Sequence, residues 1–395
     1  RSSDLATLLD SLCAVEPDRR PGSPGNDVAV DLVASVLRSG GWDVRTPQFP
    51  VIDWAGSPGT LRLGDREWVV QPSPYGTGWS GSAPLHLAAT EADLAADHRG
   101  AVLLLHGELT ATPLTPKGYP FYGSERDARV VAALESCGAV AVVAVTGRAE
   151  LAGAVDPFPL IEDGAFVVPV GDLRRTDGDE VIAAARACED PVVVLELPAR
   201  RWDASARNVI AVRGDQSDRI TVVAHIDSKP GTPGAVDNAA GVVVLLRAAE
   251  LLDDLPDDVR PGVELLAVNG EDHHQAPGEV DYLAHADLAS VRLAINIDAA
   301  GLRGTSTAFS GYGLPDGFDL KPLQQNGLVE GPPWPMSDHM VFAMAGRSAI
   351  ALTSDALERV LDEVAHTPGD VPELVDTALL EQAAQAVAAL VRSPR

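Results

Sequence analysis

Cysteine is scarce in this sequence of 395 residues, which contains only Cys13, Cys137 and Cys188. An odd number of widely spaced cysteines does not build a disulfide framework, and no Cys-x-x-Cys pair is present to hold a structural zinc ion. We therefore expect free thiols, and we expect any bound metal to be held by other side chains.

Basic residues are also few, with 30 Lys and Arg against 57 Asp and Glu, for a formal net charge of −27. Only Lys117, Lys229 and Lys321 are lysines. Proteins that bind nucleic acids need basic patches for the phosphates, so this composition excludes a nucleic-acid partner. The negative charge by itself does not indicate a cationic substrate.

Long apolar runs are missing, and none reaches the roughly 18 residues that a membrane span requires. The longest runs, around Ala139 to Val145 and Val192 to Leu197, predict buried strands. The residues Arg1-Ser2-Ser3-Asp4-Leu5 show no secretory signal pattern. We expect a soluble protein without a membrane partner, leave open whether it is cytoplasmic or secreted, and make no prediction of its oligomeric state.

The apolar fraction of 46% and the length are typical of a globular protein with two or three domains. The sequence pattern changes near residue 84. From there, predicted strands and helices follow one another without any cluster of catalytic residue types. We predict a catalytic domain from residues 1–83 and 199–395, and a smaller inserted α/β domain from 84–198. Within the insert we expect strands at 100–106, 138–145 and 164–170, and helices at 126–137 and 180–188.

From Asn208 onward, apolar strands alternate with amphipathic helices, which is typical of a mostly parallel sheet covered on both faces. A helix at 27–40, followed by a strand start at Gly41, precedes this region. The predicted fold is therefore α/β, with a mostly parallel mixed sheet sandwiched by helices. The expected strands are 208–213, 220–225, 263–268, 293–297 and 348–352, the expected helices are 238–252, 280–285 and 375–391, and a Gly/Pro-rich loop spans 301–335.

Histidine and carboxylate side chains stand where these elements end or begin. His225 and Asp227 close one strand, Asp298 closes another, and Asp237 opens a helix. Ligands of open α/β sheets bind in the crevice at the carboxyl ends of the strands. We therefore expect these side chains, together with the pair Glu271-Asp272, to meet in one crevice.

Each of these residues also has an ordinary structural interpretation. Asp237-Asn238 is typical of a helix N-cap, and His225 of a buried histidine with satisfied hydrogen bonds. Asp227, two residues after His225, lies on the same side of the strand and can orient the imidazole.

Taken together, however, the residues predict a two-metal hydrolase site. Carboxylates and neutral imidazoles suit Zn²⁺, and Asp237 is the candidate to bridge two ions. Asp298 would be costly to bury as a charge without a cation, and His366 lies on a loop, as functional residues often do. In the acidic pair, one carboxylate can bind metal while the other takes a proton from water; His273 and His274 beside it are further ligands or bystanders.

Several motifs occur in the order His225-Ile-Asp-Ser, Asp237-Asn, Asn269-Gly-Glu-Asp, Asn296-Ile-Asp and His366-Thr-Pro-Gly-Asp. They resemble the co-catalytic zinc aminopeptidases of metallopeptidase family M28, which also includes relatives of glutamate carboxypeptidase and glutaminyl cyclase. Ser337-Asp-His resembles the segment that lines the pocket in that family. The resemblance covers residues 5–55 and 200–392, and the middle of the chain is similar to a protease-associated domain.

The resemblance implies a zinc aminopeptidase fold and two zinc ions per chain. His225, Asp237 and Asp298 would hold one ion, and Asp237, Asp272 and His366 the other. It implies that Glu271 is the general base, that His339 stabilises the oxyanion, and that the metals polarise the scissile carbonyl and anchor the free amine of the substrate.

The sequence departs from the family pattern at two positions. The acidic pair is Glu271-Asp272 where Glu-Glu is commoner, so the second ligand has a shorter arm. Ala365 precedes His366 where some aminopeptidases have a tyrosine that contacts the transition state. The first departure affects metal spacing or selectivity, with Co²⁺ or Mn²⁺ as alternatives to zinc.

Three functions are compared. The leading hypothesis is an aminopeptidase that acts on peptides. The second is an amidase or carboxypeptidase-like hydrolase of a specialised small amide, with Tyr312 and Trp334 of the 301–335 loop shaping its pocket. The third is a non-catalytic binding relative, which the intact Glu271 and the complete ligand set disfavour. A glutaminyl cyclase is disfavoured because those relatives resemble single-zinc sites.

Overall fold

The computed structural model describes residues 4–119, 123–146, 157–162 and 164–393, which form two compact units. The larger unit comprises residues 1–51 and 205–395, and the smaller one residues 52–204. The chain passes between them within β2 (Gln48–Gly56) and β10 (Ala199–Arg207), which pair as a two-stranded sheet. The sequence placed the boundaries at residues 83/84 and 198/199. The two units instead divide at 51/52 and 204/205. The strands from residue 59 onward pair inside the smaller unit.

The larger unit is built on one eight-stranded mixed sheet in the order β1-β11-β13-β12-β14-β17-β15-β16. Its four central strands are parallel neighbours, and antiparallel pairs flank them on both sides. This arrangement confirms the predicted α/β fold. The strands are β1 (Asp43–Arg45), β11 (Val209–Arg213), β12 (Arg219–His225), β13 (Gly262–Val268), β14 (Val291–Ile297), β15 (Thr307–Tyr312), β16 (Val329–Glu330) and β17 (Ser348–Ser354).

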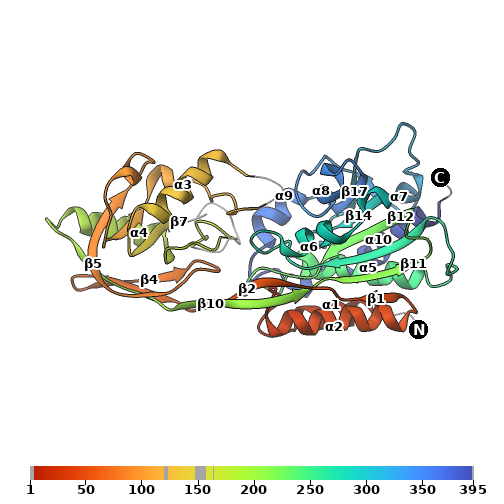
Figure 1. Ribbon diagram of the computed structural model, residues 1–395, viewed down its shortest axis with the longest axis horizontal. Coiled ribbons are helices and arrows are strands. Elements are labelled where there is room, and N and C mark those ends of the chain that lie inside the picture. Colours follow the sequence, from red (N-terminus) through yellow and green to blue (C-terminus); the bar gives the residue numbers. More distant parts are fainter. Residues whose placement is uncertain (1–3, 120–122, 147–156, 163, 394–395) are drawn as a thin grey trace. The chain divides into compact units, whose positions relative to one another are not determined.

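Helices cover both faces of this sheet (Figure 1). On one face, α5 (Ala240–Leu251) packs between the sheet and the helices α1 (Leu5–Cys13), α2 (Pro24–Ser39) and α10 (Thr377–Arg392). On the other lie α6 (Pro277–His285) and α8 (His339–Met344). Helix α5 is apolar almost all round, which is typical of a helix enclosed on every side. Its burial against β12 anchors the sheet centre from which the candidate ligands project.

The loop expected at 301–335 is partly wrong, because it contains β15 and the short helix α7 (Lys321–Gln325). Strand β15 pairs with β17 in antiparallel register and buries Ala308 and Phe309 in the core. Only four consecutive residues of this strand are buried, and glycines and prolines surround it, so its local pattern resembles a loop. Pairing with β17, more than 30 residues later in the chain, stabilises it as a strand.

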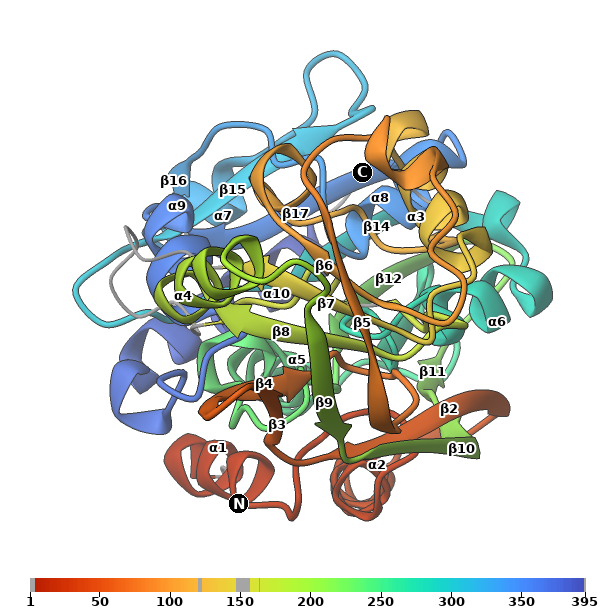
Figure 2. The ribbon, with the colours of Figure 1, turned by 90° about the vertical axis from the view of Figure 1, so that its left-hand side faces the viewer.

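The smaller unit contains a closed barrel in the order β3-β4-β8-β7-β6-β5-β9, with helix α4 (Arg175–Arg186) against β3, β7 and β8 (Figure 2). Helix α3 (Glu125–Ser136) packs in the same unit. The strands are β3 (Gly59–Leu63), β4 (Arg66–Pro72), β5 (Trp79–Ala88), β6 (Val102–Leu105), β7 (Ala141–Thr146), β8 (Val170–Arg174) and β9 (Val192–Leu197).

The strand expected at 164–170 is wrong apart from its last residue, because β8 begins only at Val170. Pro169 has no N–H to donate to a neighbouring strand. Asp172, within β8, is buried and accepts hydrogen bonds from Ser73 Oγ (2.6 Å) and from the backbone N–H of Leu160 (2.9 Å). A buried carboxylate in mid-strand breaks the apolar pattern by which strands are predicted. Burial raises the pKa of Asp172 to about 7.

Among the described residues, no helix combines the length and the apolar character needed to cross a bilayer.

Helix α2 offers a matched test of the core. Val30 is fully buried and Val28, on the same helix, is 58% exposed. Val30→Ala is expected to lower the free energy of unfolding by about 1–3 kcal/mol, because it removes buried methyl groups and leaves a cavity. Val28→Ala is expected to change it by less than about 0.5 kcal/mol.

Both substitutions gain the same helix propensity from alanine, so their difference isolates burial. Urea denaturation of both variants and the wild type measures it. Equal losses in the two variants would contradict the described packing of α2.

Candidate metal centre

The carboxyl ends of three parallel strands bring the candidate ligands together. Strand β12 lies between β13 and β14, and the chain continues first to β13 on one side and later to β14 on the other. Such a switch point opens a crevice at the strand ends. His225 is the last residue of β12, and Asp298 directly follows β14. The topology therefore brings His225 and Asp298 to the same edge of the sheet, where the sequence predicted that they meet.

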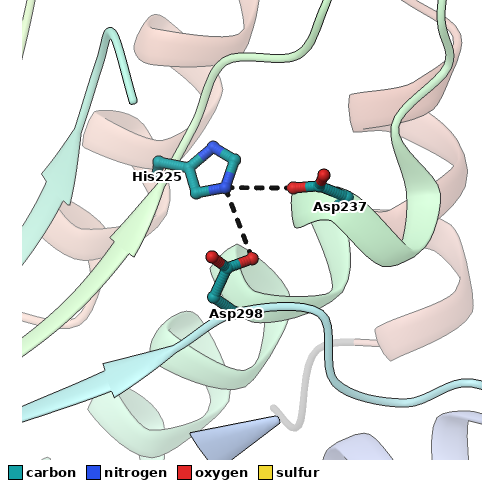
Figure 3. A group of neighbouring side chains, drawn as sticks. All are labelled: His225, Asp237 and Asp298. Atoms are coloured by element: carbon teal, nitrogen blue, oxygen red, sulfur yellow. Dashed lines mark ion pairs between the residues drawn. The ribbon is translucent and has the colours of Figure 1, made fainter. Parts of the chain in front are cut away.

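One group of side chains consists of His225, Asp237 and Asp298 (Figure 3). The Nε2 atom of His225 lies 3.1 Å from Oδ1 of Asp237 and 3.4 Å from Oδ1 of Asp298. All three residues are buried. One ligand atom from each lies within 4.8 Å of the others, close enough for all three to bind a single metal ion.

A second group consists of Asp237, Asp272 and His366. The Nε2 atom of His366 lies 3.3 Å from Oδ2 of Asp237 and 3.1 Å from Oδ1 of Asp272. Asp237 thus turns one carboxylate oxygen toward each group, as a bridging ligand does. The structure brings together all five residues that the sequence singled out as metal ligands.

Several buried polar atoms of these groups have no hydrogen-bond partner among the described residues: both ring nitrogens of His225, Oδ2 of Asp272 and Oδ1 of Asp298. Burying polar atoms unpaired is costly. The cost is offset when lone pairs converge on a cation, and imidazole nitrogens with carboxylate oxygens form a typical zinc donor set. The residues present therefore fit two metal ions.

The electrostatics of the side chains also reflect an excess of negative charge. Burial opposes protonation of His225, but the carboxylates of Asp298, Asp227 and Asp237 outweigh it and raise the pKa of the imidazole well above its usual range. Burial raises the pKa of Glu271, with the charges of Asp272, Asp298 and Asp338 acting in the same direction and His225 opposing them. Glu271 lies beside the first group, with Oε2 4.0 Å from Nε2 of His225.

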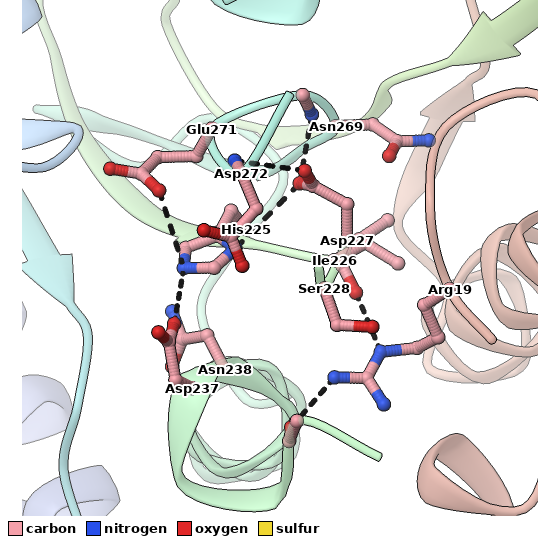
Figure 4. Close-up of polar contacts among 12 residues, drawn as sticks. Arg19, His225, Ile226, Asp227, Ser228, Asp237, Asn238, Asn269, Glu271 and Asp272 are labelled. Carbon is pink, nitrogen blue, oxygen red and sulfur yellow. Dashed lines mark hydrogen bonds and ion pairs between the residues drawn. The ribbon is translucent and has the colours of Figure 1, made fainter. Parts of the chain in front are cut away.

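Asp227 fixes the turn that carries Glu271 and Asp272 (Figure 4). Its Oδ1 accepts a hydrogen bond from the N–H of Gly270 (2.8 Å), and its Oδ2 accepts one from the N–H of Asp272 (3.0 Å). Oδ1 is also 3.6 Å from Nδ1 of His225, too far for a hydrogen bond but close enough to act on its charge. Asp227 is completely buried, so these contacts favour a positioning role.

Two further residues hold the backbone around the bridging Asp237. The carboxylate of Asp370 accepts hydrogen bonds from the N–H groups of Val236 (2.7 Å) and Asp237 (3.0 Å), and burial raises its pKa to about 7. The buried guanidinium of Arg19 donates to the carbonyls of Ile226 (2.7 Å) and Gly234 (2.7 Å), at the two ends of the loop between β12 and Asp237 (Figure 4).

His339 is buried, and both of its ring nitrogens face protein atoms. Nε2 lies 2.7 Å from the carbonyl oxygen of Trp334 and therefore donates to it, while Nδ1 lies 3.4 Å from Nδ2 of Asn296. Burial lowers the pKa of His339 to about 4, so the ring is neutral at pH 7. These contacts favour a positioning role over direct stabilisation of an oxyanion.

The segment that His339 holds reaches the first metal group. Asn296 donates to Ser337 Oγ (2.8 Å), which in turn donates to Oδ2 of Asp298 (2.5 Å). Ser337 has a φ of 78°, in the left-handed region that a serine rarely adopts, and His366 has a φ of 61°. Backbone strain of this kind is common at functional sites, where the surrounding contacts maintain it.

Sequence reasoning missed three residues around this centre, namely Arg19, Lys229 and Glu279, and it named Asp338 only as part of the Ser337-Asp-His segment. Glu279 and Asp338 are buried, and burial raises the pKa of Glu279 to about 8 and that of Asp338 well above its usual range. No local pattern identifies Arg19 or Glu279, because Arg19 lies in a loop and Glu279 is ordinary at the start of a helix. A lysine directly after the His-x-Asp-Ser motif was the one available signal.

Comparisons with known proteins agree with this geometry. Residues 208–391 match the family model described as peptidase family M28. Aminopeptidase YwaD of Bacillus subtilis is 26% identical over 94% of this chain and 80% of its own length. The probable lipoprotein aminopeptidase LpqL of Mycobacterium tuberculosis is 27% identical over 87% of this chain and 67% of its own.

The fold is also that of a solved structure, BSAP, a zinc aminopeptidase from Bacillus subtilis. It superposes with a TM-score of 0.72 at 22% identity, covering 98% of this chain and 93% of the other. The predictions of the family and of a hydrolytic peptidase are therefore confirmed. All the candidate ligands lie within residues 208–391, the part of this chain that matches peptidase family M28.

Proposed function

We propose that this protein is a zinc-dependent aminopeptidase that removes N-terminal residues from peptides. The observation that carries the proposal is the pair of three-residue groups sharing Asp237, with Glu271 beside them. Two relatives with similar sequences are named aminopeptidases, and a solved structure with the same fold is named a zinc aminopeptidase.

In this proposal His225, Asp237 and Asp298 hold one zinc ion, and Asp237, Asp272 and His366 hold the other. When bound, zinc lowers the pKa of water to about 7 and polarises a carbonyl group. The remaining work falls to the protein side chains. Burial of the ligands keeps the bridging carboxylate in place, together with the hydrogen bonds that the backbone N–H groups of Val236 and Asp237 donate to Asp370.

Glu271 is assigned the proton transfers. Its carboxylate is the partly exposed member of the acidic pair, whereas Asp272 beside it is buried. Glu271 takes the proton of the attacking water and delivers it to the amine that leaves when the peptide bond breaks. Asp227 is assigned a positioning role for Glu271, because its carboxylate accepts hydrogen bonds from the backbone of the turn at Gly270 and Asp272.

Substrates with free and blocked amines test the function directly. The wild-type protein with added Zn²⁺ is expected to hydrolyse aminoacyl-p-nitroanilides and to leave the matched N-acetylated compounds uncut. Release of p-nitroaniline is the measurement. Cleavage of the blocked compounds alone would favour the amidase alternative, and cleavage of neither, across a panel of side chains, would favour a binding relative.

Glu271→Gln tests the general base. The amide keeps the shape of the side chain but cannot accept the proton, so kcat is expected to fall by roughly 10²–10⁴-fold. Zinc content, measured by elemental analysis, is expected to stay near two ions per chain. Retained turnover would remove Glu271 from this role, and loss of zinc together with activity would make Glu271 a ligand.

Asp227→Asn tests the positioning role. One acceptor oxygen becomes an NH₂ group that faces a backbone N–H, which loosens the turn at Gly270 and Asp272. Zinc affinity is expected to fall about 10–100-fold, as for other residues that orient metal ligands. Competition with a chromophoric chelator measures it. Asp316→Asn, at an exposed aspartate, is the control for the lost charge.

A further inference from the structure

Lys229 places a buried positive charge on one metal group. Its side chain is only 6% exposed, and its Nζ lies 3.5 Å from Oδ1 of Asp272. The same Nζ donates a hydrogen bond to the backbone carbonyl of Asp272 (3.2 Å). Burying a lysine beside a ligand is costly unless the charge is compensated, so this contact is built into the site.

The other metal group has no such neighbour. Among the described residues, no lysine or arginine nitrogen lies within ion-pair distance of Asp237 or Asp298, whose ion-pair partners are imidazoles. The two groups therefore share Asp237 but differ in charge. In the first group His225 lies beside Asp298. In the second group His366 lies beside Asp272, whose carboxylate also contacts the ammonium group of Lys229.

We propose that Lys229 makes the two zinc sites unequal, lowering the affinity of the Asp237–Asp272–His366 site so that it is filled second and exchanges its metal more readily. The inference rests on the proposed function, since it presupposes two zinc ions. It adds a residue that controls the loading of one of them.

The physical reason is competition for one carboxylate. A zinc ion on Asp272 shares that side chain with an ammonium ion, and two positive charges a few ångströms apart repel strongly in a buried site. Removing Lys229 leaves Asp272 in place, because Asp227 holds its backbone N–H independently. The substitution therefore removes the repulsion while the backbone of Asp272 stays held.

The solvent exposure of His366 also lowers the zinc affinity of the second site. The side chain of His366 is 29% exposed, whereas that of His225 is completely buried. Water that reaches the second site competes for its metal and opens a path for exchange. Both features make this site the weaker one.

The test is a zinc titration of the metal-free full-length chain by calorimetry with a competing chelator. The wild type is expected to bind two ions with separate affinities. Lys229→Met is expected to tighten the second ion about ten-fold or more and to leave the first unchanged. Lys229→Gln, a second neutral variant, is expected to do the same, and Lys229→Arg to behave as the wild type.

Lys321→Met controls for the change in net charge, because Lys321 is exposed on α7. It is expected to change neither affinity. Unchanged or weaker second binding in both neutral variants would overturn the inference, and so would equal tightening of both ions. A wild type that binds fewer than two ions would instead contradict the proposed two-zinc function.

Two ligand variants assign the effect to a site. With Asp298→Asn, which disables the first group, Lys229→Met is still expected to tighten the remaining ion. With His366→Ala, which disables the second, Lys229→Met is expected to have no effect. If Lys229→Met instead tightened zinc binding only in the His366→Ala background, Lys229 would act on the His225 site, and the proposal would be overturned.

Discussion

A concentration of buried negative charge is the constraint on which the rest of this structure depends. Asp227, Asp237, Asp272 and Asp298 are all buried at the carboxyl edge of one sheet, with the partly exposed Glu271 beside them. Isolated carboxylates do not stay charged in such surroundings without cations or hydrogen bonds. Asp227 is satisfied by backbone N–H groups. Oδ2 of Asp272 and Oδ1 of Asp298 have no hydrogen-bond partner among the described residues. A dication is a partner that fits both oxygens.

The fold meets this constraint by making the surrounding backbone rigid. Parallel strands bring His225 and Asp298 to neighbouring ends, while the ligands from outside the sheet are fixed by individual bonds. Asp370 holds the backbone of Asp237, and Arg19 bonds to carbonyls at both ends of the loop that leads there. A site assembled from separate segments would otherwise lose metal affinity through small displacements of each ligand. Asp370 and Arg19, which are not candidate ligands, therefore help to hold the candidate ligand Asp237 in place.

Much of the site could be predicted from the sequence, because its ligands stand at ends of strongly apolar strands, where topology brings them together. The role of Arg19 could not be predicted, because its hydrogen-bond partners Ile226 and Gly234 lie more than 200 residues away in the chain. The strands of the barrel before residue 84 and β15 were missed for a related reason. Their short patterns are interrupted by glycine, proline or polar residues, and they are stabilised by pairing with distant strands. Burial of Asp172 within β8 shows the same effect, since its hydrogen bonds come from Ser73 and Leu160.

The pair Glu271-Asp272 combines a short metal-ligand candidate with a contact to a lysine. The aspartate arm is shorter by one methylene than a glutamate would be, and Nζ of Lys229 reaches both its carboxylate and its backbone carbonyl. Oδ1 of Asp272 faces Lys229 and His366, while Oδ2 has no partner. Asp237 differs from Asp272 in this respect, because its two oxygens face the imidazoles of His225 and His366. The two groups thus share Asp237 and yet differ in charge and exposure, because only the second contacts Lys229 and its His366 is 29% exposed whereas His225 is completely buried.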